Sequence, residues 1–335
     1  MTFGVDIGTT SVAAVAVSEA GGLVASASVV HRADIEGLGA GVHEQDPSML
    51  LDAVRDALHK VGAGDGARIG WTGQMHGVVG VDRELRPVTR FVTWCDARRF
   101  GGSVMEGWAR EGRKDIFKCL SSCGLAVAAF TGRCETDETF LHSWHLEGRE
   151  FPESWLPEFV PGSMVGDNQS GVFAAQCLVP GSAVVNIGTS GQLSVVGEGI
   201  GGERRPYFGG VMRCRASLIG GQALAALRQR LGVTWDELNA MEDIPEVANC
   251  LGVIVDDLAA GIEIPAEAPI VGVGNALRFN PALRRAVERR FSRPCVVPDL
   301  PEMAAYGAAL ARQRRRPRSC AGPDDSGRSQ GRSRV

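Results

Sequence analysis

The chain has 335 residues, 44% of them hydrophobic, and a formal net charge of −4 at pH 7, and this length is sufficient for two domains with separate cores. Eight arginines and two aspartates lie in residues 311–335, so the rest of the chain carries about ten excess negative charges, which argues against nucleic acid as the main partner. Apolar runs are too short to cross a membrane, and the first predicted strand leaves no room for a signal peptide. The nine cysteines form no Cys-x-x-Cys pair and are typical of free thiols in a reducing compartment. We therefore expect a cytoplasmic protein.

The first thirty residues predict three strands joined by glycine turns. Residues 3–30 alternate between apolar runs and turns, a pattern typical of consecutive strands. The first turn contains the phrase Val-Asp-Ile-Gly-Thr-Thr, residues 5–10. Its glycine lets a ligand approach the backbone, and successive N–H groups in such a turn can bind an anion.

Helical and strand patterns follow in the first half. A helix is predicted over residues 47–61, because apolar residues recur at helical spacing, Asp46 can cap the first turn and Pro47 fits the first helical position. The other expected elements are strands over 68–72, 78–81 and 91–94, a helix over 113–131 and a loop over 148–163.

The second half repeats the phrase of the first turn. Residues 185–190 read Val-Asn-Ile-Gly-Thr-Ser within an apolar run. Two related turns, one in each half, indicate a duplicated architecture with two phosphate-binding hairpins across a cleft. The later elements expected are helices over 222–231, 235–239, 247–260, 280–291 and 302–313, and strands over 269–273 and 295–297.

A glycine turn between a strand and a helix completes the pattern. Residues 270–281 read Ile-Val-Gly-Val-Gly-Asn-Ala-Leu-Arg-Phe-Asn-Pro, which alone is a weak nucleotide signal. Hairpin, hairpin and then glycine turn is the order of the actin-like ATPase cleft. In this order of motifs the chain resembles the FGGY family of carbohydrate kinases.

Specific segments carry the resemblance. Residues 6–11, 186–191, 272–281 and 301–310 resemble the family's first phosphate motif, second phosphate motif, adenosine motif and C-terminal helix. Residues 73–77 (Gly-Gln-Met-His-Gly) and 92–98 (Val-Thr-Trp-Cys-Asp-Ala-Arg) are most similar to sedoheptulokinases, with xylulokinases next.

The resemblance implies an α/β fold of two ribonuclease-H-like lobes, as in actin-like ATPases, around a central cleft. The implied reaction is ATP-dependent phosphorylation of a ketose at a primary hydroxyl, first of all sedoheptulose to sedoheptulose 7-phosphate, with xylulose or ribulose as alternatives. ATP and Mg²⁺ are the implied cofactors, and a small ketose is the expected partner, without nucleic acid or membrane. Monomer and homodimer both stay open. The expected division is an N-terminal lobe over 1–176, a C-terminal lobe over 177–314 and a disordered Arg-rich tail over 315–335.

The resemblance also implies roles for single residues. Asp167, in the Gly-Asp-Asn-Gln of residues 166–169, is the expected catalytic base, although the same letters are common in Asx-turns. Asp6 is expected to hold Mg²⁺, with a buried hydrogen-bonded aspartate as an equal alternative. The expected sugar-binding residues are Gln74, Met75, His76, Trp94, Asp96 and Arg98. The expected ATP-binding residues are Gly8, Thr9, Thr10, Ser11, Gly188, Thr189, Ser190, Gly272, Gly274 and Asn275.

Three further assignments also compete with ordinary structural roles. His76 would also fit a satisfied core histidine, Arg98 a solvated ion pair, and the turn hydroxyls plain hairpin chemistry.

The chain is shorter than the family pattern. The match fades over 101–114, 161–166 and 231–246, which indicates missing internal segments. Residues 162 and 167 are too close to admit a supporting strand pair, so we expect low activity and local disorder or altered packing over 160–170. A non-catalytic remnant that binds sugar or nucleotide without turnover is therefore the alternative function.

Overall fold

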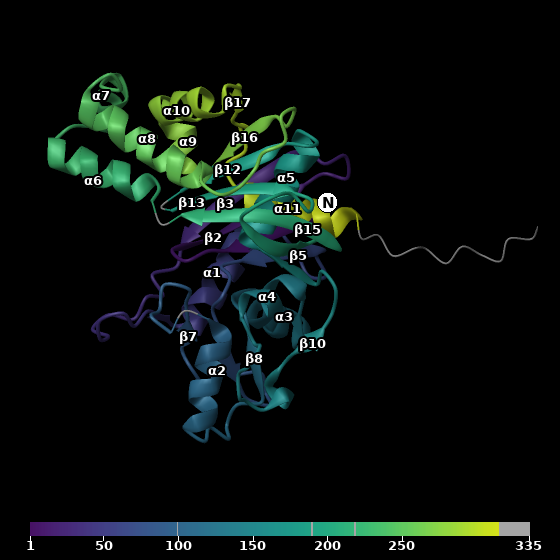
Figure 1. The fold of residues 1–335 in the computed structure, drawn as a ribbon. Coiled ribbons are helices and arrows are strands. Elements are labelled where there is room, and N and C mark those ends of the chain that lie inside the picture. Colours follow the sequence, from purple (N-terminus) through teal and green to yellow (C-terminus); the bar gives the residue numbers. More distant parts are fainter. Residues whose placement is uncertain (99, 189, 218, 315–335) are drawn as a thin grey trace, which may run out of the picture.

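The computed structural model describes residues 1–98, 100–188, 190–217 and 219–314 (Figure 1). The predicted phosphate-binding residue Thr189 and the predicted disorder of residues 315–335 lie outside the described residues. None of the helices in the described part combines the length and the apolar character needed to cross a bilayer.

The first sheet contains the three strands predicted at the start of the chain and two later ones. Its order is β11-β5-β1-β2-β3, formed by β1 (Thr2–Ile7), β2 (Ser11–Val17), β3 (Leu23–Val30), β5 (Ile69–Gly73) and β11 (Met164–Gly166). β1 pairs antiparallel with β2 and parallel with β5, and β11 joins the parallel edge. The expected local disorder before Asp167 is wrong over Met164–Gly166, because these three residues form a buried strand paired with β5; this is one strand and not a strand pair.

The second sheet repeats this arrangement. Its order is β14-β15-β13-β12-β16-β17, formed by β12 (Ala183–Ile187), β13 (Gly191–Val196), β14 (Glu203–Tyr207), β15 (Gly210–Ser217), β16 (Ile270–Val273) and β17 (Cys295–Val296). β12 pairs antiparallel with β13 and parallel with β16, as β1 does with β2 and β5. The duplication predicted from the repeated phrase is confirmed.

Two helices form a layer between the sheets (Figure 1). α5 (Asp167–Leu178) and α11 (Met303–Arg314) pack against each other, and one buried apolar cluster joins them to strands of both sheets. The backbones are in close contact: a Cβ at Gly4 would lie 1.9 Å from the Ala305 carbonyl oxygen, and one at Gly307 would lie 2.0 Å from that of Ser170. Glycine at these positions is what allows α11 to reach the first sheet and α5.

Gly307 should therefore be intolerant of a single methyl group. Gly307→Ala is expected to lower the free energy of unfolding by about 3 kcal/mol, because the obstructing atoms belong to a backbone that must shift. Gly252, within α8 (Pro245–Ala259), is the matched control, because a Cβ there meets nothing within 4 Å. Gly252→Ala should raise stability by about 0.5–1 kcal/mol. Urea denaturation of both variants measures this, and equal effects of the two substitutions would contradict it.

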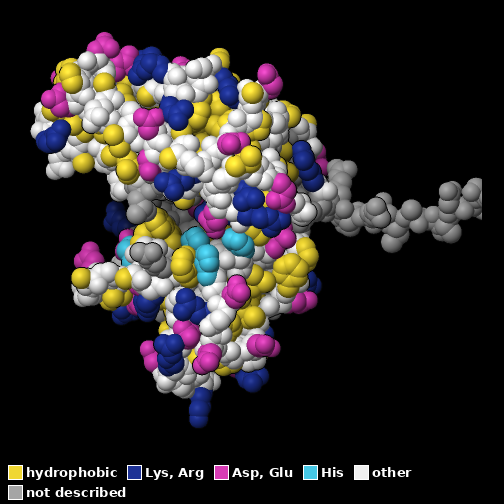
Figure 2. Space-filling view, in the orientation of Figure 1, with side chains coloured by type: hydrophobic (Ala, Val, Ile, Leu, Met, Phe, Trp, Pro, Cys, Tyr) yellow, Lys and Arg dark blue, Asp and Glu magenta, His cyan; other side chains and the backbone are white. Residues whose placement is uncertain are grey.

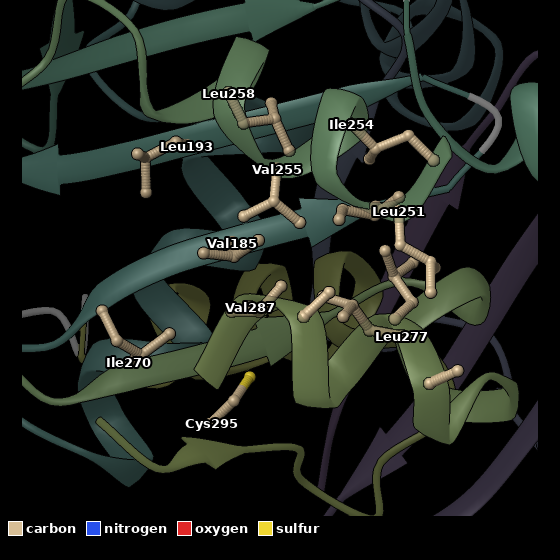
Figure 3. Close-up of a cluster of buried hydrophobic side chains, with 14 of the residues drawn as sticks. Val185, Leu193, Leu251, Ile254, Val255, Leu258, Ile270, Leu277, Val287 and Cys295 are labelled. Carbon is tan, nitrogen blue, oxygen red and sulfur yellow. The ribbon is translucent and has the colours of Figure 1, made fainter. Parts of the chain in front are cut away.

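Helices cover the outer faces of both sheets. On the first sheet these are α1 (Pro47–Lys60) and α3 (Ser122–Thr131). Asp46 caps α1 as predicted, since its carboxylate accepts the Ser48 N–H at 2.8 Å. On the second sheet the helices are α6 (Gly221–Leu231), α7 (Trp235–Ala240), α8, α9 (Asn275–Phe279) and α10 (Pro281–Phe291). Figure 3 shows side chains of α8, α9 and α10 meeting those of β12, β13 and β16 in this core.

A smaller region extends below the first sheet in Figure 1. It contains β4 (Glu44–Gln45), β6 (Val79–Val81), β7 (Phe91–Val92), β8 (Lys118–Leu120), β9 (Glu135–Thr136), β10 (Glu158–Phe159), α2 (Gly101–Arg110), α4 (Glu138–Ser143) and a 3₁₀ turn, Glu153–Trp155. The single helix expected over 113–131 is wrong in its first half, where β8 pairs with β6. α2 and α5 were not predicted.

Candidate active site

One cavity of about 260 Å³ lies where elements of both sheets meet the central helices. From the first sheet it is lined by Asp6 at the end of β1, and from α5 by Asp167 and Asn168. The second half contributes the hairpin after β12, the glycine turn after β16 and the start of α11; its lining residues are Asn186, Gly188, Ser190, Gln192, Gly272, Gly274, Asn275, Arg278, Glu302 and Met303. The cavity thus gathers segments from the whole length of the chain.

The first turns of α5 and α11 both border this cavity. Asp167 and Asn168 open α5, and Met303 and Ala304 open α11. Unpaired N–H groups and the positive end of the helix dipole favour anions at such positions. Together with the second hairpin, these helix ends make the cavity suitable for a phosphate chain.

The glycine turn after β16 has a backbone that only glycine accommodates. Gly274 has a φ of +89°, and a Cβ there would lie 2.5 Å from the Ile187 carbonyl oxygen and 2.7 Å from Asn186 Oδ1. A Cβ at Gly188, by contrast, would meet nothing within 4 Å. The turn therefore packs tightly on β12 while the hairpin tip leaves open space for a ligand.

Asp6 has the most perturbed carboxylate of the cavity. Its Oδ1 atom is buried and has no hydrogen-bond partner. Burial, followed by the charges of Asp167 and Glu302, raises the pKa of Asp6 to about 8. Without a cation this carboxyl group is therefore protonated at pH 7.

The unpartnered Asp6 oxygen fits a divalent cation. Carboxylate oxygens are the ligands that Mg²⁺ prefers, and Mg²⁺ usually retains water and binds substrate phosphates as well. Among the described residues, no group of three or more histidines, cysteines, aspartates or glutamates is arranged to hold a metal. Asp6 would therefore bind Mg²⁺ only together with water and phosphate oxygens.

Asp167 combines accessibility from the cavity with a raised pKa. Burial raises the pKa of its carboxyl group to about 6, while the Asn168 N–H, donated to its Oδ1 at 2.7 Å, and the Arg205 guanidinium act in the opposite direction. Arg205 is buried on β14 and pairs with Glu203 at 2.6 Å. A carboxylate with a pKa near 6 is ionised at neutral pH and still basic enough to accept a proton.

The first hairpin turn lies outside the lining of this cavity. Gly8, Thr10 and Ser11 do not border it, and Thr9 forms hydrogen bonds with residues predicted to bind sugar. The Thr9 hydroxyl accepts the Trp94 Nε1–H at 2.8 Å and lies 3.5 Å from Gln74 Oε1. The structure therefore joins the first turn to residues that were predicted to bind sugar, whereas the second turn lines the cavity.

The remaining predicted sugar-binding residues have well-defined partners. Asp96 accepts the Arg98 guanidinium at 2.7 Å and the His43 N–H at 2.9 Å, and Arg98 also pairs with Glu44 at 2.7 Å. Arg98 therefore forms the ion pair that was the alternative to sugar binding. Met75 lies in the hydrophobic core, where it packs under Gly166 at the end of β11.

His76 is held in an unusual backbone conformation. Its φ is +68°, and its Nδ1–H donates to the Ser143 carbonyl oxygen at 2.8 Å. Burial lowers its pKa, so the ring stays neutral at pH 7. Its ring centroid lies 6.1 Å from that of His145, which lies 6.1 Å from that of His142. Figure 2 shows histidine side chains gathered where the upper and lower parts of the molecule meet.

Sequence reasoning missed several residues around the site. Glu302 lies immediately before α11 and lines the cavity, and only its place within the quoted motif of residues 301–310 could have pointed to it. Gln45 contacts Thr9 and Gln74 across long sequence separations. Arg205 faces Asp167 from the second sheet. No local pattern in the sequence indicates these last two contacts.

Comparison with known proteins finds a family match for the N-terminal part of the chain. Residues 1–131 match the model of the FGGY family of carbohydrate kinases, N-terminal domain. A gluconokinase from Bacillus subtilis is 30% identical over 120 residues, covering 34% of this chain and 21% of that protein. A xylulose kinase from Staphylococcus xylosus is 31% identical over 99 residues, covering 28% of this chain and 20% of the relative. The matching segment thus spans about a fifth of the length of these curated relatives.

The fold is shared over nearly the whole chain. The crystal structure of a xylulose kinase from Brucella ovis superimposes with a TM-score of 0.78 at 19% sequence identity, covering 93% of this chain and 89% of that one. This likeness confirms the expected α/β fold of the actin-like ATPase type, with two related lobes.

Proposed function

We propose that this chain, whose residues 1–131 match the N-terminal domain of the FGGY family of carbohydrate kinases, is a kinase of that family and transfers the γ-phosphoryl group of ATP to a hydroxyl of a small sugar. One observation carries the proposal: Asp6 and Asp167 from the first half line the same cavity as Gly188 and Gly274 from the second. That arrangement brings a base, a cation ligand and phosphate-binding backbone to one place. Residues 1–176 would bind the sugar and residues 177–314 the nucleotide.

In the proposed reaction Asp167 is the general base. Its carboxylate accepts the proton of the substrate hydroxyl as that oxygen bonds to the γ-phosphorus. The bond from phosphorus to the β–γ bridging oxygen breaks at the same time, so that ADP leaves. The starts of α5 and α11 and the second hairpin line the cavity, where free N–H groups would stabilise the phosphates. When bound by Asp6, Mg²⁺ would neutralise phosphate charge.

For the sugar we propose a ketose, with sedoheptulose first, because residues 73–77 and 92–98 are most similar to sedoheptulokinases. Gluconate and xylulose are the acceptors that the names of the matching relatives suggest. We place the reaction in the cytoplasm, where ATP is available and the eight free cysteines of the described part would stay reduced.

A coupled assay of ADP release over a panel of sedoheptulose, xylulose, ribulose and gluconate tests this proposal. We expect sugar-dependent turnover with one ketose preferred. Binding of ATP and sugar by calorimetry without turnover on any acceptor would instead favour a non-catalytic binding protein. Preferred turnover of gluconate would retain the kinase and overturn the ketose.

A further inference from the structure

Gln45 connects the first hairpin turn to the sugar-binding residues, although no motif pointed to it. It lies on β4 and is fully buried. Its Nε2 group donates to the Thr9 carbonyl oxygen at 2.6 Å and to Asp34 Oδ1 at 2.7 Å. Its Oε1 atom accepts the Gln74 Nε2–H at 3.1 Å. A buried amide with partners at both ends has little freedom to move.

Chemistry fixes which way this amide points. A backbone carbonyl can only accept hydrogen bonds, so the end of Gln45 that faces the Thr9 carbonyl, and with it Asp34 Oδ1, must be the NH₂ group. The oxygen of Gln45 then faces Gln74 and requires a donor there. Gln74 must therefore turn its own NH₂ group towards Gln45, which also brings that group 3.4 Å from the Gly8 carbonyl oxygen.

The orientation of Gln74 in turn determines the direction of the hydrogen bonds of Thr9. With its NH₂ group facing Gln45, Gln74 turns its oxygen towards the Thr9 hydroxyl, 3.5 Å away. The Thr9 oxygen already receives the Trp94 indole N–H at 2.8 Å, so its proton is directed to Gln74. Trp94 is 39% exposed, so this end of the chain of hydrogen bonds is open to a ligand. Gln74 is only 2% exposed, so the group that the ligand can reach is the half-buried Thr9 hydroxyl, whose oxygen is an acceptor.

We propose that Gln45 is a positioning residue that sets the hydrogen-bond polarity of Thr9 and Gln74, so that this part of the site accepts a hydroxyl of a neutral sugar and rejects a carboxylate. The inference rests on the proposed function, because it assumes that Trp94 and Thr9 face the sugar. A substrate hydroxyl can donate to the Thr9 oxygen, whereas a carboxylate would meet an acceptor there and remain unpaired.

The first test measures sugar affinity by calorimetry, which needs no turnover, and KM for sugar and for ATP in parallel. Gln45→Leu should weaken binding of the preferred neutral sugar at least tenfold and leave the Kd for ATP within about twofold. Gln176→Leu is the matched control, because the Gln176 amide also bridges backbone groups, Ser182 O at 2.6 Å and Gly181 N at 2.8 Å, but away from the site. It should leave the sugar affinity unchanged.

A double-mutant cycle separates positioning from simple structural support. If Gln45 acts through Thr9, then Gln45→Leu should cost little sugar affinity in the Thr9→Val background, where the hydroxyl is gone. The preference for a neutral sugar over its carboxylate analogue should also shrink in Gln45→Leu. Additive effects, or an unchanged preference, would overturn the inference. Wild-type protein that binds none of the sugars would instead refute the proposed function on which it rests.

Discussion

Replacing Asp167 by asparagine is expected to lower kcat ~10²–10⁴-fold while the Kd for ATP stays within about threefold of the wild-type value. Asparagine retains the volume of the side chain and an oxygen that can accept the Asn168 N–H, but it cannot take a proton from the substrate. The loss should therefore fall on the chemical step. Steady-state kinetics with the preferred sugar, together with calorimetry for ATP, measure both quantities.

Asp137→Asn is the control for this experiment. Asp137 is also buried, and burial raises its pKa to about 6 as well. It caps α4, however, by accepting the Thr139 N–H at 2.9 Å, and it does not line the cavity. Asparagine is an equally good N-cap, so this variant should keep its kcat. If Asp167→Asn retains most of its activity, Asp167 is not the base.

The second large effect concerns the stability of the protein without metal. The pKa of Asp6 is raised from 3.8 to about 8 in the folded state, so between these values the folded protein binds one more proton than the unfolded chain. Stability must then fall as the pH rises through this window. Since each pH unit is worth about 1.4 kcal/mol, Asp6 should cost a few kcal/mol by pH 8. Asp6→Asn should remove this loss and be more stable than the wild type at pH 8.

The measurement is the free energy of unfolding in urea at pH 6.5 and pH 8 with EDTA. In the folded protein Asp137 and Asp167 titrate at about pH 6, below this window. His31, His76 and His142, whose pKa values are lowered in the folded state, contribute equally to the wild type and to Asp6→Asn, so the difference between the two proteins reports on Asp6. Asp46→Asn, which changes a carboxyl group whose pKa is lowered, should run parallel to the wild type. Mg²⁺ added together with ADP, in place of EDTA, should stabilise the wild type more at pH 8 than at pH 6.5. Equal pH dependence of Asp6→Asn and wild type would contradict the assignment.

The sequence was informative wherever a pattern is local. The repeated phrase placed both hairpins, and Asp46 with Pro47 marked the start of α1. The start of α5 was missed because aspartate and asparagine suit both tight turns and the first turn of a helix. α2 was missed because glycines open it, and these glycines are there for packing: a Cβ at Gly101 would lie 2.5 Å from Trp144 Cδ1.

In the candidate site, too, the residues within local motifs could be predicted, whereas contacts between distant segments could not. Asp6, Asp167, Gly188 and Gly274 are each part of a recognisable segment, and the structure brings them to one cavity. The separation of the first turn from that cavity was not foreseeable, because it depends on contacts of Thr9 with Trp94 and Gln45, which lie 85 and 36 residues away along the chain. Such contacts come from tertiary packing and leave no periodic signal.

The position of α11 has a consequence for how the protein is made. This helix is the last described element of the chain, yet it packs on β1 and β5, and grooves that open at Gly4 and Gly70 receive its backbone. During synthesis the first sheet would emerge from the ribosome well before the helix that completes its core. α5 follows β11 directly and covers part of the inner face of this sheet, but the part that α11 covers stays open until residues 167–302 have been made. A nascent chain of this protein should therefore depend on chaperones over that interval, and truncation before Met303 should leave the N-terminal half unable to mature.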